Sequence, residues 1–316
     1  MEKRLVFIVN PSAKNGVSKK IWNKLNYKLD NIPYEVFYTK HQKHAQDLAH
    51  SIALSISDPI LMVAVGGDGT IHEVINGVVS FQHVTIAYIP AGSGNDFAKG
   101  YKLPTKPDEC LAHLLQMKEN EGVFFDTGKF TNITGQGHFV NSLGAGFDAS
   151  ITRRVNSSFT KKWLNLLGLG KLVYAIFMLI ELFLYRPTTF YLVINGVEYT
   201  FERAWFVTIS NQAFYGGGMK ISPLADPGDG ELDITVVSEI SRIMILFIFL
   251  SVFWGGHTKF KAVHLLKGTD ILIHSTANIP VHADGEFAGE TPVQIKVCPH
   301  SWKLIKTYEN VKQLIA

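Results

Sequence analysis

The feature that most constrains this chain is an apolar run that ends in a glycine-rich turn. Residues 60–65 read ILMVAV and continue directly into the GGDGT sequence of residues 66–70, after which the spacing predicts a helix. A continuous apolar run of this length is typical of a parallel strand that is buried on both faces. A buried strand, a tight turn and a helix in that order are the repeating unit of an open α/β sheet.

The same unit recurs through the first part of the chain. Three further apolar runs predict strands there: residues 5–10, 34–39 and 84–89. After about residue 125 the pattern changes to short strand-like runs separated by glycine turns, which favours an antiparallel sandwich or barrel. We therefore predict an α/β domain over 1–127 and a β-rich domain over 128–305. Residues 306–316 would complete the first domain if the chain returns there.

The bulk composition excludes several classes of protein. A chain of 316 residues with 47% hydrophobic and 18% charged residues can bury enough apolar surface for two folded domains. The formal net charge is +3 and no dense basic block occurs, which argues against a nucleic-acid partner. The two cysteines, Cys110 and Cys298, lack metal-ligand or redox spacing and are interpreted as reduced cytosolic thiols. A mean hydropathy of +0.12 with 21 phenylalanines favours some contact with lipid.

The GGDGT turn has the composition of a phosphate-binding loop. Gly66, Gly67 and Gly69 allow the main chain to approach a ligand closely, and the helix that follows would direct free N–H groups at an anion. Thr70 can cap that helix or donate to a phosphate oxygen. Asp68 would repel phosphate unless it holds a cation or orients a hydroxyl. The alternative is a tight strand-to-helix turn that binds nothing.

A second turn of the same kind follows the strand at 84–89. Residues 92–96 read GSGND, and two such turns at the carboxyl ends of parallel strands are positioned to share one ligand. We predict that Ser93 and Asn95 hydrogen-bond this ligand, whereas Asp96 would cap the next helix. The sequence contains no P-loop motif and no clean dinucleotide fingerprint after the first strand, so those nucleotide-binding classes are disfavoured.

Taken together, these motifs resemble the bacterial diacylglycerol kinase-type lipid kinases. GGDGT alone would also suit NAD kinases and phosphofructokinases, but GSGNDFA at 92–98 favours the lipid kinases. Further runs of the chain match the same family: 141–149 (NSLGAGFDA), 215–219 (YGGGM), 229–233 (DGELD) and 284–286 (DGE). The resemblance extends from residue 6 to about residue 306. It implies a Rossmann-like, NAD-kinase-like α/β domain followed by an antiparallel β-sandwich domain.

The resemblance also implies a reaction and its site residues. Such enzymes transfer the γ-phosphate of ATP to a hydroxyl of diacylglycerol or a related membrane lipid, giving phosphatidic acid or an analogous phospholipid. Glu286 would be the general base, and Asp284 would assist it or hold the Mg²⁺ bound with ATP, although Asp-Gly is ordinarily a hairpin turn. The predicted nucleotide-binding residues are Asn10, Thr39, Gly66, Gly67, Asp68, Gly69, Thr70, Glu73, Ser93 and Asn95. For Thr39 a helix cap or turn is an equal alternative, and Asn10 could simply end its strand.

A structural Mg²⁺ site is implied in the second domain. Mapped by resemblance, its ligands are the Asp229 side chain and the main-chain carbonyls of Asp226 and Glu231. The alternative is a β-turn that holds no metal. The twelve histidines show no pair at metal-ligand spacing, and His282, His274 and His264 are interpreted as strand or surface residues.

Two apolar segments, 163–185 and 243–256, bear on the partner of the protein. Neither is a convincing membrane span, but both would suit the bilayer interface, with Lys161, Lys162, Lys259 and Lys261 nearby. The alternative is that both segments are ordinary core. The lipid kinase hypothesis predicts a cytoplasmic protein bound peripherally to the inner face of the membrane, and a homodimer is compatible with the sequence.

Two other functions compete with the lipid kinase. One is a NAD kinase-like enzyme with a soluble acceptor, against which the GSGNDFA run and the apolar segments argue. The other is a catalytically silent protein that binds nucleotide or lipid. The retained acidic residues argue against it: Asp68, Asp229, Asp284 and Glu286.

Overall fold

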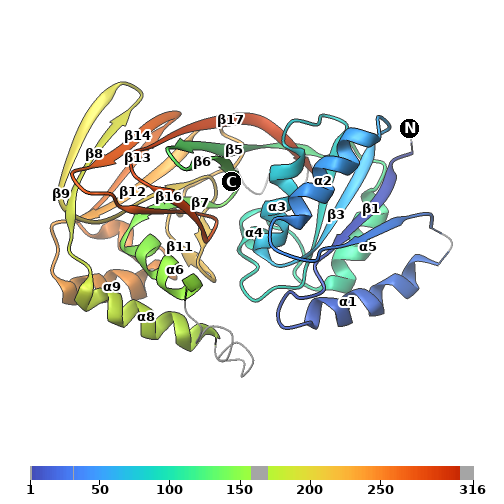
Figure 1. The fold of residues 1–316 in the computed structure, drawn as a ribbon, viewed down its shortest axis with the longest axis horizontal. Helices are drawn as coiled ribbons and strands as arrows, with labels where there is room; N and C mark the ends of the chain where they lie inside the picture. Colours follow the sequence, from blue (N-terminus) through green and yellow to red (C-terminus); the bar gives the residue numbers. More distant parts are fainter. Residues whose placement is uncertain (1, 31, 158–169, 307–316) are drawn as a thin grey trace. The chain divides into compact units, whose positions relative to one another are not determined.

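The computed structural model describes residues 2–30, 32–157 and 170–306, which divide into two compact units (Figure 1). Unit 1 contains residues 2–127 together with 299–306, and unit 2 is Gly128–Cys298. Two strands, β5 (Val123–Asn132) and β17 (Val293–Leu304), begin in one unit and end in the other. The chain therefore returns to unit 1 within β17, earlier than the sequence suggested, and residues 307–316 lie outside the described residues.

Unit 1 is built on a parallel sheet with the strand order β2-β1-β3-β4-β17. Its other strands are β1 (Arg4–Val9), β2 (Glu35–Tyr38), β3 (Ile60–Gly66) and β4 (Val84–Pro90). Every residue of β3 and β4 is buried, as the continuous apolar runs predicted. The strand order reverses between β1 and β3, and ligands of such sheets bind at the carboxyl ends of the strands beside this reversal.

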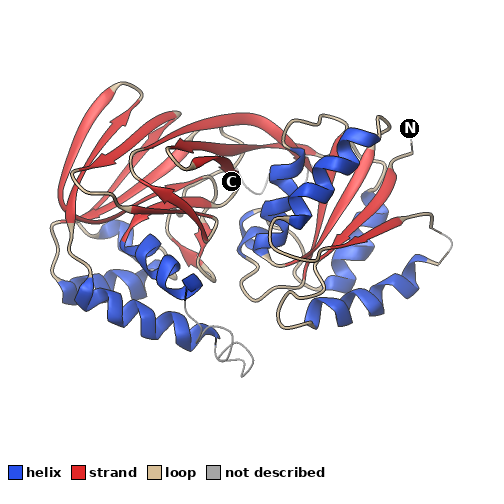
Figure 2. Ribbon diagram, viewed as in Figure 1, coloured by secondary structure: helices blue, strands red, loops and turns tan. Residues whose placement is uncertain are grey.

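Helices cover both faces of the sheet in unit 1 (Figure 2). Helices α1 (Val17–Asn26) and α5 (Pro107–Met117) pack in one apolar cluster with β1, β3 and β4, while α2 (His44–Ser55) and α3 (Asp68–Val78) contact each other and the sheet. The short elements are the 3₁₀ turn η1 (Tyr27–Leu29) and α4 (Asp96–Gly100). Because α3 begins directly after β3, and α4 follows soon after β4, the two glycine-rich turns join strand to helix as predicted.

Unit 2 is an antiparallel β structure in which β7, β9 and β15 lie side by side. Its strands within Gly128–Cys298 are β6 (Gly135–Phe139), β7 (Ser142–Gly146), β8 (Thr188–Ile194), β9 (Val197–Ser210), β10 (Phe214–Tyr215), β11 (Met219–Lys220), β12 (Leu232–Ser238), β13 (Val263–Gly268), β14 (Asp270–Ser275), β15 (Pro280–Ala283) and β16 (Glu286–Glu290). Their inward-facing apolar residues form one core.

Within the described part of unit 2, three helices lie on one side of the strands (Figure 1). They are α6 (Phe147–Ser157), α8 (Gly170–Leu184) and α9 (Arg242–Val252), and the 3₁₀ turn η2 (Gly256–Lys259) follows α9. A second apolar cluster, which includes Ile151, Leu182 and Ile248, packs them against the sheet. Of the apolar segment at 163–185, residues 163–169 lie outside the described residues. No helix in the described parts of the chain has both the length and the hydropathy needed to cross a bilayer.

Candidate active site

The two glycine-rich turns of unit 1 touch each other through their main chains. A Cβ atom placed on Gly92 would lie 2.5 Å from the Cα of Gly67, closer than carbon atoms approach without displacement. The N–H of Ala91 donates to the carbonyl of Gly66 at 2.6 Å, and the Tyr88 hydroxyl donates to the same oxygen at 3.1 Å. The turns therefore form one continuous surface, and glycine is required where they meet.

Asp68 links the first turn to the second. Its Oδ1 accepts the N–H of Phe97 at 3.0 Å, so the carboxylate caps the start of α4. Burial is the main cause that raises the pKa of Asp68, and the nearby charge of Asp96 adds to it. This contact within the protein uses one carboxylate oxygen, and the role toward a cation or a hydroxyl that the sequence suggested for Asp68 stays a prediction.

Asn10, Thr39 and Thr70 meet at the same edge of the sheet, where β1, β2 and β3 end. The Asn10 amide donates from Nδ2 to the Thr70 Oγ1 at 3.1 Å, which ties the end of β1 to the first turn of α3. Thr70 is buried against Gly66, where any side chain would collide with the threonine. Thr39 is also buried, and its N–H donates to the carbonyl of Val9 at 2.9 Å. These contacts brace the edge from which the glycine turns emerge.

Glu73 braces a neighbouring helix. Its two carboxylate oxygens accept the N–H groups of Lys43 at 2.9 Å and Ala45 at 3.1 Å, at the start of α2. A negative charge at a helix N-terminus is stabilising, so the contact of Glu73 with α2 stabilises the fold whether or not a ligand is bound. The sequence analysis assigned Glu73 to the nucleotide, and that assignment stays a prediction.

Several polar groups at the turns suit an anionic ligand. The first N–H groups of an α-helix have no intrahelical acceptor, and in α3 these belong to Asp68 and Gly69. Gly69 and Ser93 are exposed. Asn95 adopts a left-handed conformation with φ of 56°, and its Oδ1 is buried without a hydrogen-bond partner among the described residues. This oxygen is an acceptor, so a donor such as a water or a ligand hydroxyl would satisfy it, whereas only the Asn95 Nδ2 can donate to an anion.

The hairpin β15–β16 of unit 2 carries the two acidic residues assigned to catalysis. Ala283 pairs with Glu286, and the two residues between them, Asp284 and Gly285, have φ values of 49° and 85°. Positive φ at both central positions is the type I′ geometry that Asp-Gly favours. The hairpin alternative is therefore the observed backbone, and it places Glu286, which is exposed, directly after the turn.

Asp284 has a structural role in addition to the catalytic or Mg²⁺-binding role assigned to it from the sequence, which stays a prediction. Its Oδ2 accepts the N–H of Val140, and its Oδ1 accepts those of Asn141 and Ser142, each at 2.9 Å. Three N–H donors fill most of the acceptor capacity of one carboxylate. Asp284 thus fastens the hairpin to the segment that leads into β7, and Glu286 remains as the candidate base.

Comparison with known proteins identifies the family. Residues 4–125 match the model of the diacylglycerol kinase catalytic domain, and residues 141–306 match the YegS C-terminal NAD kinase beta sandwich-like domain. The protein named "Putative lipid kinase YtlR" of Bacillus subtilis is 30% identical over 300 residues, which cover 93% of this chain and 96% of the relative. This chain belongs to the family of diacylglycerol kinase-type lipid kinases. The family resemblance inferred from the motifs and the lipid kinase activity are therefore confirmed.

Two further matches support the family and the fold of the kinase. A diacylglycerol kinase of Mycobacterium tuberculosis H37Rv is 31% identical over 264 residues, covering 83% of this chain and 82% of the relative. The crystal structure of a diacylglycerol kinase from Bacillus anthracis superposes with a TM-score of 0.70 at 22% identity, covering 97% of this chain and 98% of the other. The predicted fold class, a Rossmann-like α/β domain with an antiparallel β-sandwich domain, is confirmed. None of these matches supports a homodimer.

The loop at 226–231 of the kinase was expected to hold a structural Mg²⁺. The ammonium group of Lys267 in β13 lies beside its carboxylates. The Lys267 Nζ lies 2.8 Å from the Asp229 Oδ2 and 3.4 Å from the Glu231 Oε2. The other Asp229 oxygen accepts the N–H of Glu231 at 2.9 Å, and the Asp226 carbonyl accepts the N–H of Asp229 at 3.4 Å. An ammonium in this position competes with a divalent ion, so these residues do not fit the implied metal as they are arranged. We assign no metal to them.

Sequence reasoning missed a buried pair in unit 2 of the kinase. His282, which was interpreted as a strand or surface residue, lies in β15 but is buried, and its Nε2 is 3.2 Å from the Asp148 Oδ2. Asp148 falls within the quoted NSLGAGFDA run, yet the pattern gave it no role. A signal did exist, because Asp148 lies in a glycine-rich family run and His282 is two positions before the DGE run at 284–286.

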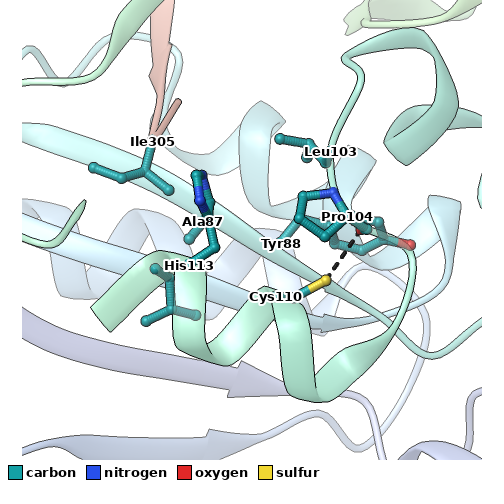
Figure 3. Close-up of a pocket in the computed structure, with 8 residues that line it drawn as sticks. Ala87, Tyr88, Leu103, Pro104, Cys110, His113 and Ile305 are labelled. Atoms are coloured by element: carbon teal, nitrogen blue, oxygen red, sulfur yellow. Dashed lines mark hydrogen bonds between the residues drawn. The ribbon is translucent and has the colours of Figure 1, made fainter. Parts of the chain in front are cut away.

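A small cavity of the kinase lies away from the glycine turns, between β4 and α5 (Figure 3). It is lined mainly by apolar side chains, and the Cys110 Sγ donates to the Pro104 carbonyl at 3.1 Å. Burial raises the pKa of the Cys110 thiol to about 12, so the sulfur is neutral at physiological pH. Burial also lowers the pKa of His113, which lines the same cavity, so both titratable groups there favour the neutral form.

Proposed function

We propose that this lipid kinase transfers the γ-phosphate of MgATP to the hydroxyl of diacylglycerol or a closely related membrane lipid, giving phosphatidic acid or its analogue. The observation that carries this proposal is the main-chain contact between Gly67 and Gly92, which joins the two turns into one phosphate-binding surface. Relatives named diacylglycerol kinase support diacylglycerol as the acceptor. The choice of ATP follows from the kinase family.

In the proposed reaction the main chain holds the phosphates. The N–H groups at the start of α3 and the positive end of its dipole bind the triphosphate, and Ser93 and Asn95 donate from the second turn. The acceptor hydroxyl oxygen attacks the γ-phosphorus, the bond to the β-phosphate oxygen breaks, and ADP leaves. Glu286 takes the proton that the hydroxyl loses. A divalent ion bound with ATP would supply neutralisation of the phosphate charge.

We further propose that helices α8 and α9 bind the bilayer surface and give the kinase a peripheral position on the inner face of the membrane. The Arg242 guanidinium at the start of α9 donates to the carbonyls of Leu182 and Tyr185 at 3.0 Å, so the two helices are tied together. Large apolar side chains are exposed on both helices and just after α9: Phe183, Leu184, Ile243, Phe247, Leu250 and Trp254. We name these six residues the α8–α9 face.

The charges around the α8–α9 face suit anionic lipid. Glu181 is the only acidic residue in the described part of either helix, and it is buried in an ion pair with Arg154. Lys259 and Lys261, which follow α9, are exposed. An apolar helical face with basic neighbours and no exposed acid is typical of helices that lie in the interface of a bilayer. The predicted neighbours Lys161 and Lys162 lie outside the described residues.

A phosphoryl-transfer assay tests the reaction. The purified kinase is incubated with γ-labelled ATP and with diacylglycerol in mixed micelles, other lipid alcohols or NAD. Label in phosphatidic acid, and its loss in Glu286→Gln with nucleotide affinity preserved, is the expected result. Label on NAD alone would refute the lipid acceptor, and an active Glu286→Gln enzyme would refute the assigned base.

A vesicle-binding assay tests the membrane surface. Phe247→Ser with Trp254→Ser should weaken sedimentation with phosphatidylglycerol vesicles at least tenfold, because two exposed apolar side chains are removed. Ile133→Ser is the matched control, because Ile133 is 92% exposed but lies in unit 2 outside both helices. Equal loss of binding in both proteins would contradict the assignment of the α8–α9 face.

A further inference from the structure

The buried pair of His282 and Asp148 lies in contact with the hairpin turn that carries Glu286. His282 is 3% exposed and its Nε2 is 3.2 Å from the Asp148 Oδ2. On the other side of the ring, the N–H of Gly285 donates to the His282 Nδ1 at 3.4 Å. One imidazole therefore connects a buried carboxylate to the main chain of the turn.

The surrounding hydrogen bonds select one tautomer of His282. The Asp148 Oδ1 accepts the N–H of Ala149 at 2.8 Å, and its Oδ2 also accepts the Thr208 hydroxyl at 3.4 Å. An ionised carboxylate only accepts, so the His282 Nε2 carries the proton and donates to Asp148. The Nδ1 then has a lone pair, which is what the N–H of Gly285 requires.

The sheet leaves room for this pair at Gly144 of β7, which is the register partner of His282. A Cβ atom on Gly144 would collide with the Asp148 carboxylate and would lie 2.5 Å from the His282 Nε2. The presence of glycine at position 144 of the family run at 141–149 is thus explained by the space that the pair occupies. The close approach also leaves the imidazole little space to rotate.

Helix α6 supplies a firm support for the pair. Asp148 is in its first turn, and Arg153 of the same helix pairs with Glu290 at 3.1 Å and stacks 5.4 Å above the Phe287 ring. Both partners belong to β16, so α6 contacts the hairpin before and after Glu286. The ion pair between Arg154 and Glu181 anchors the helix to α8.

We propose that His282 is a positioning residue for phosphoryl transfer. It holds the Asp284–Gly285 turn through the Gly285 N–H, takes its own orientation from Asp148, and so fixes the direction of the Glu286 carboxylate. This inference rests on the proposed function, in which Glu286 is the base. Because displacement of a reacting group by about 1 Å can cost roughly a hundredfold in rate, loss of this support lowers kcat without changing nucleotide binding.

Steady-state kinetics of five variants test the proposal. His282→Leu should lower kcat ten- to a hundredfold and leave the KM for ATP within twofold, while His282→Gln, which keeps a donor and an acceptor, should recover part of the loss. The control is His274→Leu, because His274 lies in β14 and stacks on Tyr191 with no contact to the turn, and its kcat should be unchanged. In His282→Leu combined with Glu286→Gln, activity should equal that of Glu286→Gln alone.

The outcomes distinguish the positioning role of His282 from the proposed role of Glu286 as the base. A wild-type kcat in His282→Leu, or a double variant that falls well below Glu286→Gln, overturns the positioning role. An active Glu286→Gln enzyme instead overturns the assigned base and with it the proposed mechanism. If His282→Leu does not fold, ¹⁵N spectra of the imidazole in the wild-type kinase decide: a neutral ring protonated at Nε2 is expected, and a ring protonated at Nδ1 refutes the proposal.

Discussion

In unit 1 the candidate ligand surface is main chain, whereas in unit 2 the candidate base is a side chain. Gly67 and Gly92 bring two turns into van der Waals contact, and the acidic residues beside them accept N–H groups of the protein. In unit 2 the turn at 284–286 is held in two ways. Its own Asp284 carboxylate accepts three N–H groups of residues 140–142, and the His282 imidazole accepts the N–H of Gly285. In unit 1 the main chain of the turns is the candidate contact with a ligand. In unit 2 main-chain N–H groups bond within the protein and hold the turn that precedes the Glu286 carboxylate.

This difference teaches that an acid within a family motif need not touch the substrate. Asp68, Glu73 and Asp284 all lie in or beside motifs, and all accept main-chain N–H groups from a segment distant in sequence. Charge-assisted bonds of this kind are stronger than neutral ones, so a single carboxylate can fix a loop that has little apolar core. The three predictions that follow test this division between scaffold and ligand contact.

The largest effect is expected for Asp284→Ala. Removal of the carboxylate leaves three main-chain N–H groups without their acceptor, which should lower the free energy of unfolding of unit 2 by about 4 kcal/mol. Hydrogen exchange at residues 140–142, followed by mass spectrometry, should accelerate. Asp284→Asn is the matched control, because asparagine also tolerates positive φ and keeps one accepting oxygen, so about half the loss is expected. Normal exchange together with lost activity would instead restore Asp284 to a catalytic role.

The sequence was informative to different degrees in the two units. In unit 1 the strands, the glycine turns and their shared edge could be predicted, because each turn is local and follows its strand directly. The contacts of Asp68 with Phe97 and of Glu73 with Lys43 could not, because they join residues 29 and 30 positions apart. In unit 2 the bond from Asn141 to Asp284 spans 143 positions. No spacing rule reaches that far, which is why the structural contacts of Asp284 could not be predicted from the sequence.

A smaller effect is expected for Gly92→Ala, which adds a Cβ at 2.5 Å from the Gly67 Cα. Relief of this overlap must separate the two turns, at a cost of about 2 kcal/mol. The affinity for ATP, measured by calorimetry, should fall at least tenfold. Gly69→Ala is the comparison, because no atom lies within 4 Å of a Cβ there, and the protein should keep its thermal stability. Unchanged ATP affinity in Gly92→Ala would show that contact between the turns is not needed for binding.

The smallest effect is expected for Lys267→Met, which tests whether a side chain replaces a metal in the loop at 226–231. The lysine is 40% exposed, so its ion pairs with Asp229, Glu231 and Asp233 are screened and should together contribute only about 1 kcal/mol. Loss of the lysine leaves three carboxylates without their cation. Millimolar Mg²⁺ or Ca²⁺ should then raise the Tm of Lys267→Met relative to a melt in EDTA. The Tm of the wild-type kinase should be the same under both conditions. If EDTA lowers the Tm of the wild-type kinase instead, the loop binds a divalent ion despite Lys267, and the lysine does not replace a metal there.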